Sequence, residues 1–212
     1  LSGRRVCLGC GAPLSLRSVM VELATPVIFV GLLWRYGATT QLGLLATYSA
    51  VLILVTVTDL EHRLIQHAVM APALLVAMAG GFVNAEMSAR RAFLGGAAGL
   101  LVLYGMYLLA QPVSRMLARL AGRTVDDVPF GFGDVTLGAF IGLITGLPGV
   151  FVALIIAILT AGVVAALLIL IRALLLRRYD ALTTMPYGPF LALGGFLVMV
   201  YGSDILSWYV SR

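Results

Sequence analysis

The sequence predicts an all-α membrane protein, a polytopic transmembrane bundle of about seven spanning helices. Hydrophobic residues make up 61% of the chain and charged residues only 11%, and the mean hydropathy is +1.07. A soluble domain carries roughly a quarter charged residues. Within hydrocarbon every backbone polar group must be bonded inside the protein, and a helix does this within a single segment. We therefore expect the chain to form one bundle of spanning helices.

Seven apolar stretches have roughly the 17–25 residues that a helix needs to cross ~30 Å of hydrocarbon. They cover residues 19–35, 42–58, 67–83, 92–110, 131–147, 149–171 and 186–209. The fifth and sixth stretches are joined by a tight turn at Leu147-Pro148-Gly149. Small residues gather in several stretches, as in Gly95-Gly96-Ala97-Ala98-Gly99. Such residues let membrane helices approach closely, which favours a tightly packed bundle.

The distribution of arginine predicts the orientation of the chain in the membrane. All 14 basic residues are arginine, and the net charge is +5. Ten lie in the N-terminal segment and alternate loops: Arg4, Arg5, Arg17, Arg63, Arg115, Arg119, Arg123, Arg172, Arg177 and Arg178. The other side holds Arg35, Arg90, Arg91 and Arg212. Because basic residues favour the cytoplasmic side, we expect a cytoplasmic N-terminus and an external C-terminus. The basic charge then reflects membrane topology, with the lipid bilayer as the partner and no nucleic acid.

Two of the nine acidic residues stand out because each lies at one end of an apolar stretch. Asp59 follows the apolar run 51–58, and Asp134 closes the sequence Gly131-Phe132-Gly133-Asp134. On the predicted topology both lie at the cytoplasmic ends of their helices. An ionised Asp at membrane depth is costly, so it is usually paired or faces water. Two carboxylates held close can share a proton, so that one activates water and the other polarises a carbonyl. Gly131 and Gly133 leave room for an extended substrate backbone beside them.

Two alternatives remain open for these acids. Each Asp could be a helix cap near the interface, since Asp is common there. A proton- or cation-coupled small transporter could also use Asp59 and Asp134. A transporter would place its acids near the bilayer midplane and would show inverted repeats. The interfacial positions and the lack of a visible repeat favour aspartic proteolysis.

Four stretches resemble the motifs of the prepilin peptidase family, also called type IV leader peptidases. Residues 130–137 resemble its Gly-x-Gly-Asp motif, and residues 59–65 its first catalytic motif. Residues 185–194 resemble the Pro-[Phe/Tyr]-Gly-Pro-Phe segment of its last helix, and residues 7–23 the end of its cysteine-bearing cytoplasmic domain. The sequence departs from the family at three positions. The family commonly has Pro where this chain has Gln66, Asp or Asn at His67, and Lys at Thr136.

A second class of Gly-x-Gly-Asp proteases, of the presenilin or signal-peptide-peptidase kind, fits less well. That class has Tyr before its first Asp, where this chain has Thr58. It also has Pro-Ala-Leu after its second Asp, whereas Pro72-Ala73-Leu74 lies between Asp59 and Asp134. The order of motifs therefore favours the prepilin peptidases.

The resemblance implies an intramembrane aspartic endopeptidase with Asp59 and Asp134 as its catalytic residues. Its substrate-binding residues would be Gly131, Gly133, Pro186, Gly188 and Pro189. The implied substrates are type IV prepilins or type II secretion pseudopilins, whose basic leader is cut off after a Gly. Cleavage would occur at the cytoplasmic face of the bacterial cytoplasmic (inner) membrane, in which this protein would be a multi-pass component.

The N-terminal segment predicts less, because it holds a single Cys-x-x-Cys pair, Cys7 and Cys10. A structural zinc site needs four ligands. Zinc at Cys7 and Cys10 is therefore expected only if a second cysteine pair is supplied. S-adenosylmethionine would be needed only if the N-methyltransferase activity of many family members is retained, and cleavage needs no cofactor. We expect residues 1–18 to be a cytoplasmic remnant of the cysteine-bearing domain, and residues 19–212 to be the transmembrane peptidase domain.

Overall fold

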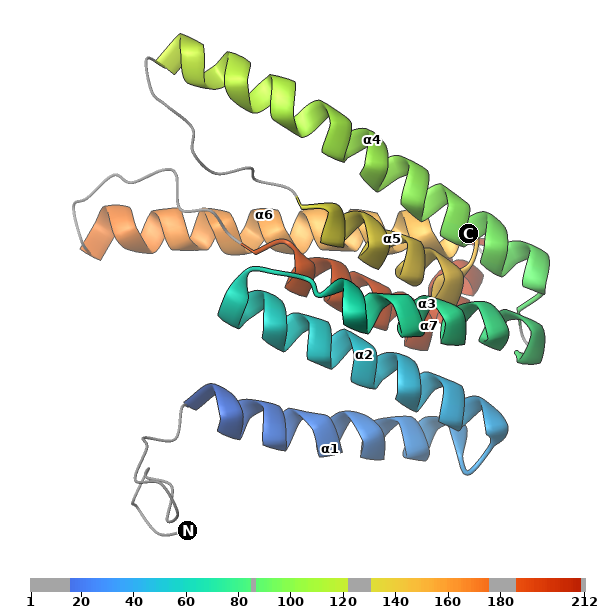
Figure 1. Cartoon of the computed structure of the whole chain (residues 1–212). Coiled ribbons are helices and arrows are strands. Elements are labelled where there is room, and N and C mark those ends of the chain that lie inside the picture. The colour runs from blue at the N-terminus through green and yellow to red at the C-terminus, as the bar shows by residue number, and fades with distance from the viewer. Residues whose placement is uncertain (1–15, 85–86, 122–130, 176–185, 211–212) are drawn as a thin grey trace, which may run out of the picture.

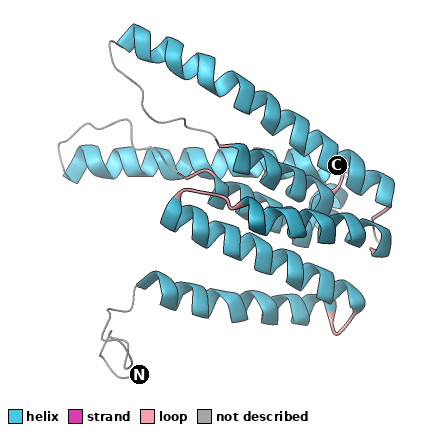
Figure 2. Cartoon of the chain, viewed as in Figure 1, coloured by secondary structure: helices cyan, strands magenta, loops and turns pink. Residues whose placement is uncertain are grey.

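The computed structural model describes residues 16–84, 87–121, 131–175 and 186–210, and these residues form helices and loops without any strand (Figure 2). The helices are α1 (Leu16–Tyr36), α2 (Thr40–His62), α3 (His67–Val83), α4 (Ala89–Ala121), α5 (Phe132–Thr145), α6 (Gly149–Leu175) and α7 (Gly188–Val210). Successive helices run in opposite directions (Figure 1). The starts of α3, α5 and α7 therefore share one end of the bundle with the ends of α2, α4 and α6. The predicted helical bundle is confirmed.

The described helices have the length and surface of a membrane protein. Five of them, α1, α2, α4, α6 and α7, are long and apolar enough to cross a bilayer. The other two are apolar but shorter, with 17 residues in α3 and 14 in α5. Large apolar side chains cover the outside, including Val27 (70% exposed) and Val163 (67% exposed). A soluble protein seldom exposes such a continuous apolar surface, so the chain is a membrane protein.

The short helix α5 lies at the centre and packs against α3, α4, α6 and α7. Leu137, Phe140 and Ile141 on α5 are fully buried. Along the seam between α4 and α5, glycines from both helices face each other. A Cβ atom on Gly95 or Gly99 would collide with a backbone carbonyl of α5, and one on Gly142 would collide with the Gly95 carbonyl. The small residues thus allow the close approach that the sequence predicts.

The helices end where the sequence supplies a cap or a special backbone conformation. At the start of α2, the Thr39 hydroxyl accepts a hydrogen bond from the Leu42 N–H at 3.3 Å. Arg63 ends α2 in the left-handed conformation, with φ 51°. Gly146 ends α5 with φ 65°, and its carbonyl accepts a hydrogen bond from the Val150 N–H at the start of α6. The predicted tight turn between these two helices is confirmed.

Helix α4 differs most from its predicted range of 92–110, because it continues to Ala121. Its 33 residues correspond to about 50 Å at 1.5 Å per residue. Hydropathy marks only the part of a helix that lies in hydrocarbon, whereas backbone hydrogen bonding can continue beyond it.

Cys7 and Cys10 lie outside the described residues.

Several Ser and Thr hydroxyls inside the bundle donate hydrogen bonds to backbone carbonyls of their own helix. The fully buried Ser49 hydroxyl donates to the Leu45 carbonyl at 2.7 Å, and Thr56 and Thr160 donate in the same way to carbonyls four residues earlier. These bonds satisfy the hydroxyls without a partner helix. Asp59 is different, because it is the one buried acidic residue among those the structure describes.

Candidate active site

Asp59 lies in the last turn of α2 and is only 6% exposed. Its backbone carbonyl accepts the N–H of Arg63, which closes the helix. Its side-chain Oδ2 accepts the N–H of Gly188 at 3.0 Å, so the start of α7 holds the carboxylate in place. A Cβ atom at position 188 would lie 2.6 Å from this oxygen, which explains glycine there.

Asp134 lies in the first turn of α5, three residues after Gly131. Its Oδ2 accepts the Gly131 N–H at 3.0 Å, which satisfies a backbone donor that the helix itself leaves free. The helix N-terminus also carries a partial positive charge that favours a carboxylate. Gly131 is exposed, and the nearest atom to a Cβ built there would be Asp134 Oδ2 at 3.7 Å. The backbone at Gly131 is therefore open beside the carboxylate.

Tyr187 and Gly188 are adjacent in the chain, and each lies close to one of the two acids. Gly188 donates to Asp59, and its neighbour Tyr187 lies within electrostatic range of Asp134. Burial raises the pKa of the Tyr187 hydroxyl above its ordinary value, and the negative charge of Asp134 raises it further. The charge of Asp59 also acts on Asp134. The structure thus brings together at one end of the bundle the two acids that the sequence singled out.

No arginine neutralises either acid among the residues that the structure describes. The ion pairs found there join Arg35 to Asp204 and His62 to Glu61. The hydrogen bonds to Asp59 and Asp134 instead come from neutral backbone N–H groups. A neighbouring cation would favour the ionised form of each acid more strongly than these neutral donors do.

The loop between α2 and α3 packs directly against the Gly-x-Gly-Asp segment. Ile65 is buried, and a Cβ atom at Gly133 would lie 2.6 Å from the Ile65 Cβ. The Thr136 hydroxyl donates to the Gly133 carbonyl at 2.8 Å. Glycine at position 133 therefore has a packing role in addition to the substrate contact that the sequence predicts. No local sequence pattern indicates the role of Ile65, because its contact with Gly133 depends on how the loop between α2 and α3 folds back.

Aromatic side chains from two other helices, α3 and α4, contact Phe132, the variable residue of the Gly-x-Gly-Asp motif. The His67 ring stacks nearly parallel to the Phe132 ring, with centroids 5.7 Å apart. Tyr107 on α4 meets Phe132 edge to face at 6.1 Å. Phe132 is still 46% exposed. His67 is thus part of a ring cluster beside the candidate site, a contact that the sequence did not predict.

The proline residues of the last motif lie where α7 begins. Pro186 precedes the helix, and Pro189 is in its first turn, where a missing N–H costs no helical hydrogen bond. Both are partly buried. Tyr187 is the residue that the predicted site omitted, although it stands between two residues that were included.

The described residues contain no group of three or more His, Cys, Asp or Glu side chains that could hold a metal ion.

The fold and the acids define a polytopic helical membrane protein with two neighbouring carboxylates at one end, Asp59 buried and Asp134 partly buried. Residues 46–167, which include both Asp59 and Asp134, match the type IV leader peptidase family, and the chain belongs to this family. No solved structure matches it.

Several curated relatives carry the name prepilin leader peptidase/N-methyltransferase. The protein from Aeromonas hydrophila is 33% identical, and the match covers 100% of this chain and 67% of the relative. The protein from Xanthomonas campestris pv. campestris is 28% identical, over 94% of this chain and 64% of the relative. The Pseudomonas aeruginosa protein is 27% identical, over 96% and 65%. The chain thus spans about two thirds of the length of these relatives.

Proposed function

We propose that this protein is an intramembrane aspartic endopeptidase that removes the basic leader peptide from type IV prepilins or type II secretion pseudopilins. The observation that carries this proposal is the convergence of Asp59 and Asp134 at one end of the bundle, with Gly188 bonded to Asp59 and Tyr187 close to Asp134. Membership of the type IV leader peptidase family and the names of the relatives support the same activity.

The proposed mechanism uses one proton shared between the two acids. The ionised carboxylate takes a proton from water while the water oxygen bonds to the scissile carbonyl carbon. The protonated carboxyl gives its proton to the carbonyl oxygen. When the tetrahedral intermediate collapses, the C–N bond breaks and the leaving amine receives the proton taken from water. The hydroxyl proton of the intermediate returns to the second carboxyl, which restores the starting state. No metal or cofactor is needed for this chemistry.

The substrate contacts that we propose follow from the surroundings of the two acids. Gly131 presents open backbone beside Asp134, and residues 186–189 border Asp59. A substrate in extended form would pass between these two segments. We also propose that this end of the bundle faces the cytoplasm of a bacterial inner membrane, because the arginine distribution favours that orientation.

The activity that we propose for this chain is peptide cleavage. The relatives' names include N-methyltransferase. Methyl transfer would require S-adenosylmethionine, and zinc at Cys7 and Cys10 would require further ligands. Neither group enters the cleavage mechanism.

The test is cleavage of a prepilin-like substrate in membranes, comparing the parent with Asp59→Asn and Asp134→Asn. Each change keeps the shape of the side chain but removes its acid–base function. We expect kcat/KM to fall by about 10²–10⁴-fold for each variant. Glu61→Gln is the matched control, because Glu61 is an exposed acid two residues from Asp59. Cleavage by either Asp variant at the rate of the Glu61→Gln control would show that the catalytic pair is assigned wrongly.

A further inference from the structure

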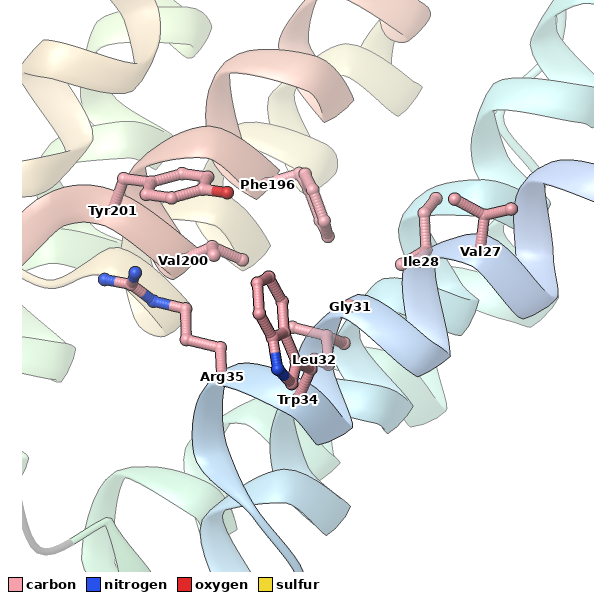
Figure 3. Close-up of a pocket in the computed structure, with 9 residues that line it drawn as sticks. All are labelled: Val27, Ile28, Gly31, Leu32, Trp34, Arg35, Phe196, Val200 and Tyr201. Atoms are coloured by element: carbon pink, nitrogen blue, oxygen red, sulfur yellow. The ribbon is translucent and has the colours of Figure 1, made fainter.

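A groove of about 520 Å³ lies between α1 and α7, on the surface of the bundle (Figure 3). Both helices pack against α2. The floor of the groove is apolar, with Leu32 and Val200 almost completely buried and Ile28 and Phe196 partly buried around them. Its volume is within the range of small-molecule sites. Because the groove is on the apolar surface of a membrane protein, its apolar floor is suited to a lipid chain.

One end of the groove carries a pair of opposite charges. Arg35 at the end of α1 forms an ion pair with Asp204 on α7, and these side chains are 36% and 59% exposed. The Arg35 guanidinium carbon also lies 4.8 Å from the centroid of the Tyr201 ring. Trp34, next to Arg35, is 91% exposed. Trp, Tyr and Arg are typical of the level where hydrocarbon meets headgroups. We therefore expect the charged end of the groove to lie at headgroup depth. It is at the end of the bundle opposite to Asp59 and Asp134.

We infer that this groove binds a phospholipid with a zwitterionic headgroup, such as phosphoethanolamine. One acyl chain lies on the floor formed by Leu32, Phe196 and Val200. The phosphate contacts Arg35, whose guanidinium group suits phosphate oxygens. The ammonium group contacts Asp204. An exposed ion pair contributes little free energy. The bond between Arg35 and Asp204 can therefore be replaced by a contact of Arg35 with the phosphate and a contact of Asp204 with the ammonium group.

The charge arrangement selects among lipids. A phosphoglycerol headgroup offers a phosphate to Arg35 but no cation to Asp204. Once Arg35 binds the phosphate, Asp204 would be left without a cation. A zwitterionic headgroup with a primary amine satisfies both side chains. We therefore expect phosphatidylethanolamine to be retained more strongly than phosphatidylglycerol, by about fivefold.

Gly31 offers a direct way to fill the groove. It lines the groove, and a Cβ atom built on it meets no atom within 4 Å. A larger side chain at this position can therefore enter the groove without disturbing the packing. Gly162 on α6 is a matched control, because it is also exposed with nothing within 4 Å of its Cβ position and does not line the groove.

The experiment uses protein purified in mild detergent from membranes with equal amounts of phosphatidylethanolamine and phosphatidylglycerol. Native mass spectrometry counts the phospholipid that each variant retains. We expect the parent and Gly162→Leu to keep one phosphatidylethanolamine that Gly31→Leu loses. In Asp204→Asn the preference for phosphatidylethanolamine should fall from about fivefold to near one. If Gly31→Leu fails to fold, Val27→Trp replaces it, because Val27 also lines the groove and is 70% exposed.

Three results would overturn the inference. Gly31→Leu could retain as much lipid as Gly162→Leu, or Asp204→Asn could keep the full preference for phosphatidylethanolamine. Cross-linking from Gly31→Cys could also capture a second copy of this chain or another membrane helix, in which case protein rather than lipid occupies the groove. Lipid retention can be measured whether or not the protein is a peptidase. The groove residues are on α1 and α7, and the residues changed in the cleavage test are Asp59 on α2 and Asp134 on α5.

Discussion

The two ends of the bundle hold their carboxylates in different ways. At one end, Asp59 is 6% exposed and accepts a hydrogen bond from the neutral N–H of Gly188. At the other end, the Asp204 side chain is 59% exposed and forms an ion pair with Arg35. Among the described residues, the first arrangement encloses an acid whose hydrogen-bond donor is neutral, and the second pairs an acid with a cation at the surface.

This difference is consistent with the function proposed for each end of the bundle. A cation beside an acid favours its ionised form, which suits a structural ion pair. A carboxyl that must gain and lose a proton in each catalytic cycle is better served by backbone N–H groups and by a second carboxylate nearby. Burying a carboxylate away from water costs free energy unless it is hydrogen-bonded or paired, and the bond from Gly188 offsets part of this cost at Asp59.

The largest effect should come from Gly188→Ala. A Cβ atom there would lie 2.6 Å from Asp59 Oδ2, so either the carboxylate or the start of α7 must move. A displacement of about 1 Å in a catalytic group can reduce the rate by about 10²-fold, and we expect kcat/KM for leader cleavage to fall by about that factor. Gly105→Ala is the control, since a Cβ at Gly105 meets nothing within 4 Å. Equal rates in the two variants would mean that Gly188 does not position Asp59.

Much of this end could be predicted from the sequence, but its hydrogen bonds could not. Hydropathy predicts seven helices, and their alternating direction places Asp59 and Asp134 at the same end. The bond from Gly188 to Asp59 joins residues 129 positions apart. Such a bond depends on how α7 packs against α2, and no local pattern encodes that packing. The catalytic roles of the two acids remain predictions until the Asp→Asn variants are measured.

A second change tests the centre of the bundle between the two ends. In Gly142→Ala the added Cβ meets the Gly95 carbonyl across the seam of α4 and α5. Overpacking of this kind costs about 1–3 kcal/mol, and we expect the free energy of unfolding in detergent to fall by that amount. Gly162→Ala, on an open surface, should leave it unchanged. A stable Gly142→Ala protein would show that the helices can separate at the seam without cost.

The glycine seam also shows why some features follow from sequence and others do not. Clusters such as Gly95-Gly96 indicate close helix contact, and this prediction is confirmed. Which helix they contact was not predicted, because small residues mark a surface but not its partner. The length of α4 was underestimated for a different reason, since hydropathy does not report where a helix ends outside the membrane.

A smaller effect is expected at the aromatic cluster beside the candidate active site. His67→Ala removes the ring that stacks on Phe132, two positions before Asp134. Aromatic pairs contribute about 0.5–1.5 kcal/mol, so we expect kcat/KM to fall by about two- to tenfold. His62→Ala is the control, because the His62 side chain is 66% exposed in the same region. If the two histidine variants cleave equally well, the stack is dispensable for positioning the start of α5.

The smallest effect should come from Arg35→Gln, at the opposite end. This change removes the ion pair with Asp204 and the contact with the Tyr201 ring. Exposed ion pairs contribute about 0.2–1 kcal/mol, so the free energy of unfolding should fall by no more than about 1 kcal/mol. Leader cleavage should stay within about twofold of the parent, because Arg35 is in the last turn of α1, at the end of the bundle opposite to Asp59 and Asp134. A double-mutant cycle with Asp204→Asn isolates the pair energy. A coupling well above 1 kcal/mol would mean that the ion pair is stronger than an exposed pair should be. A large loss of cleavage would mean that the two ends are not independent, and that α1 and α7 transmit the state of this ion pair to Asp59 and Asp134.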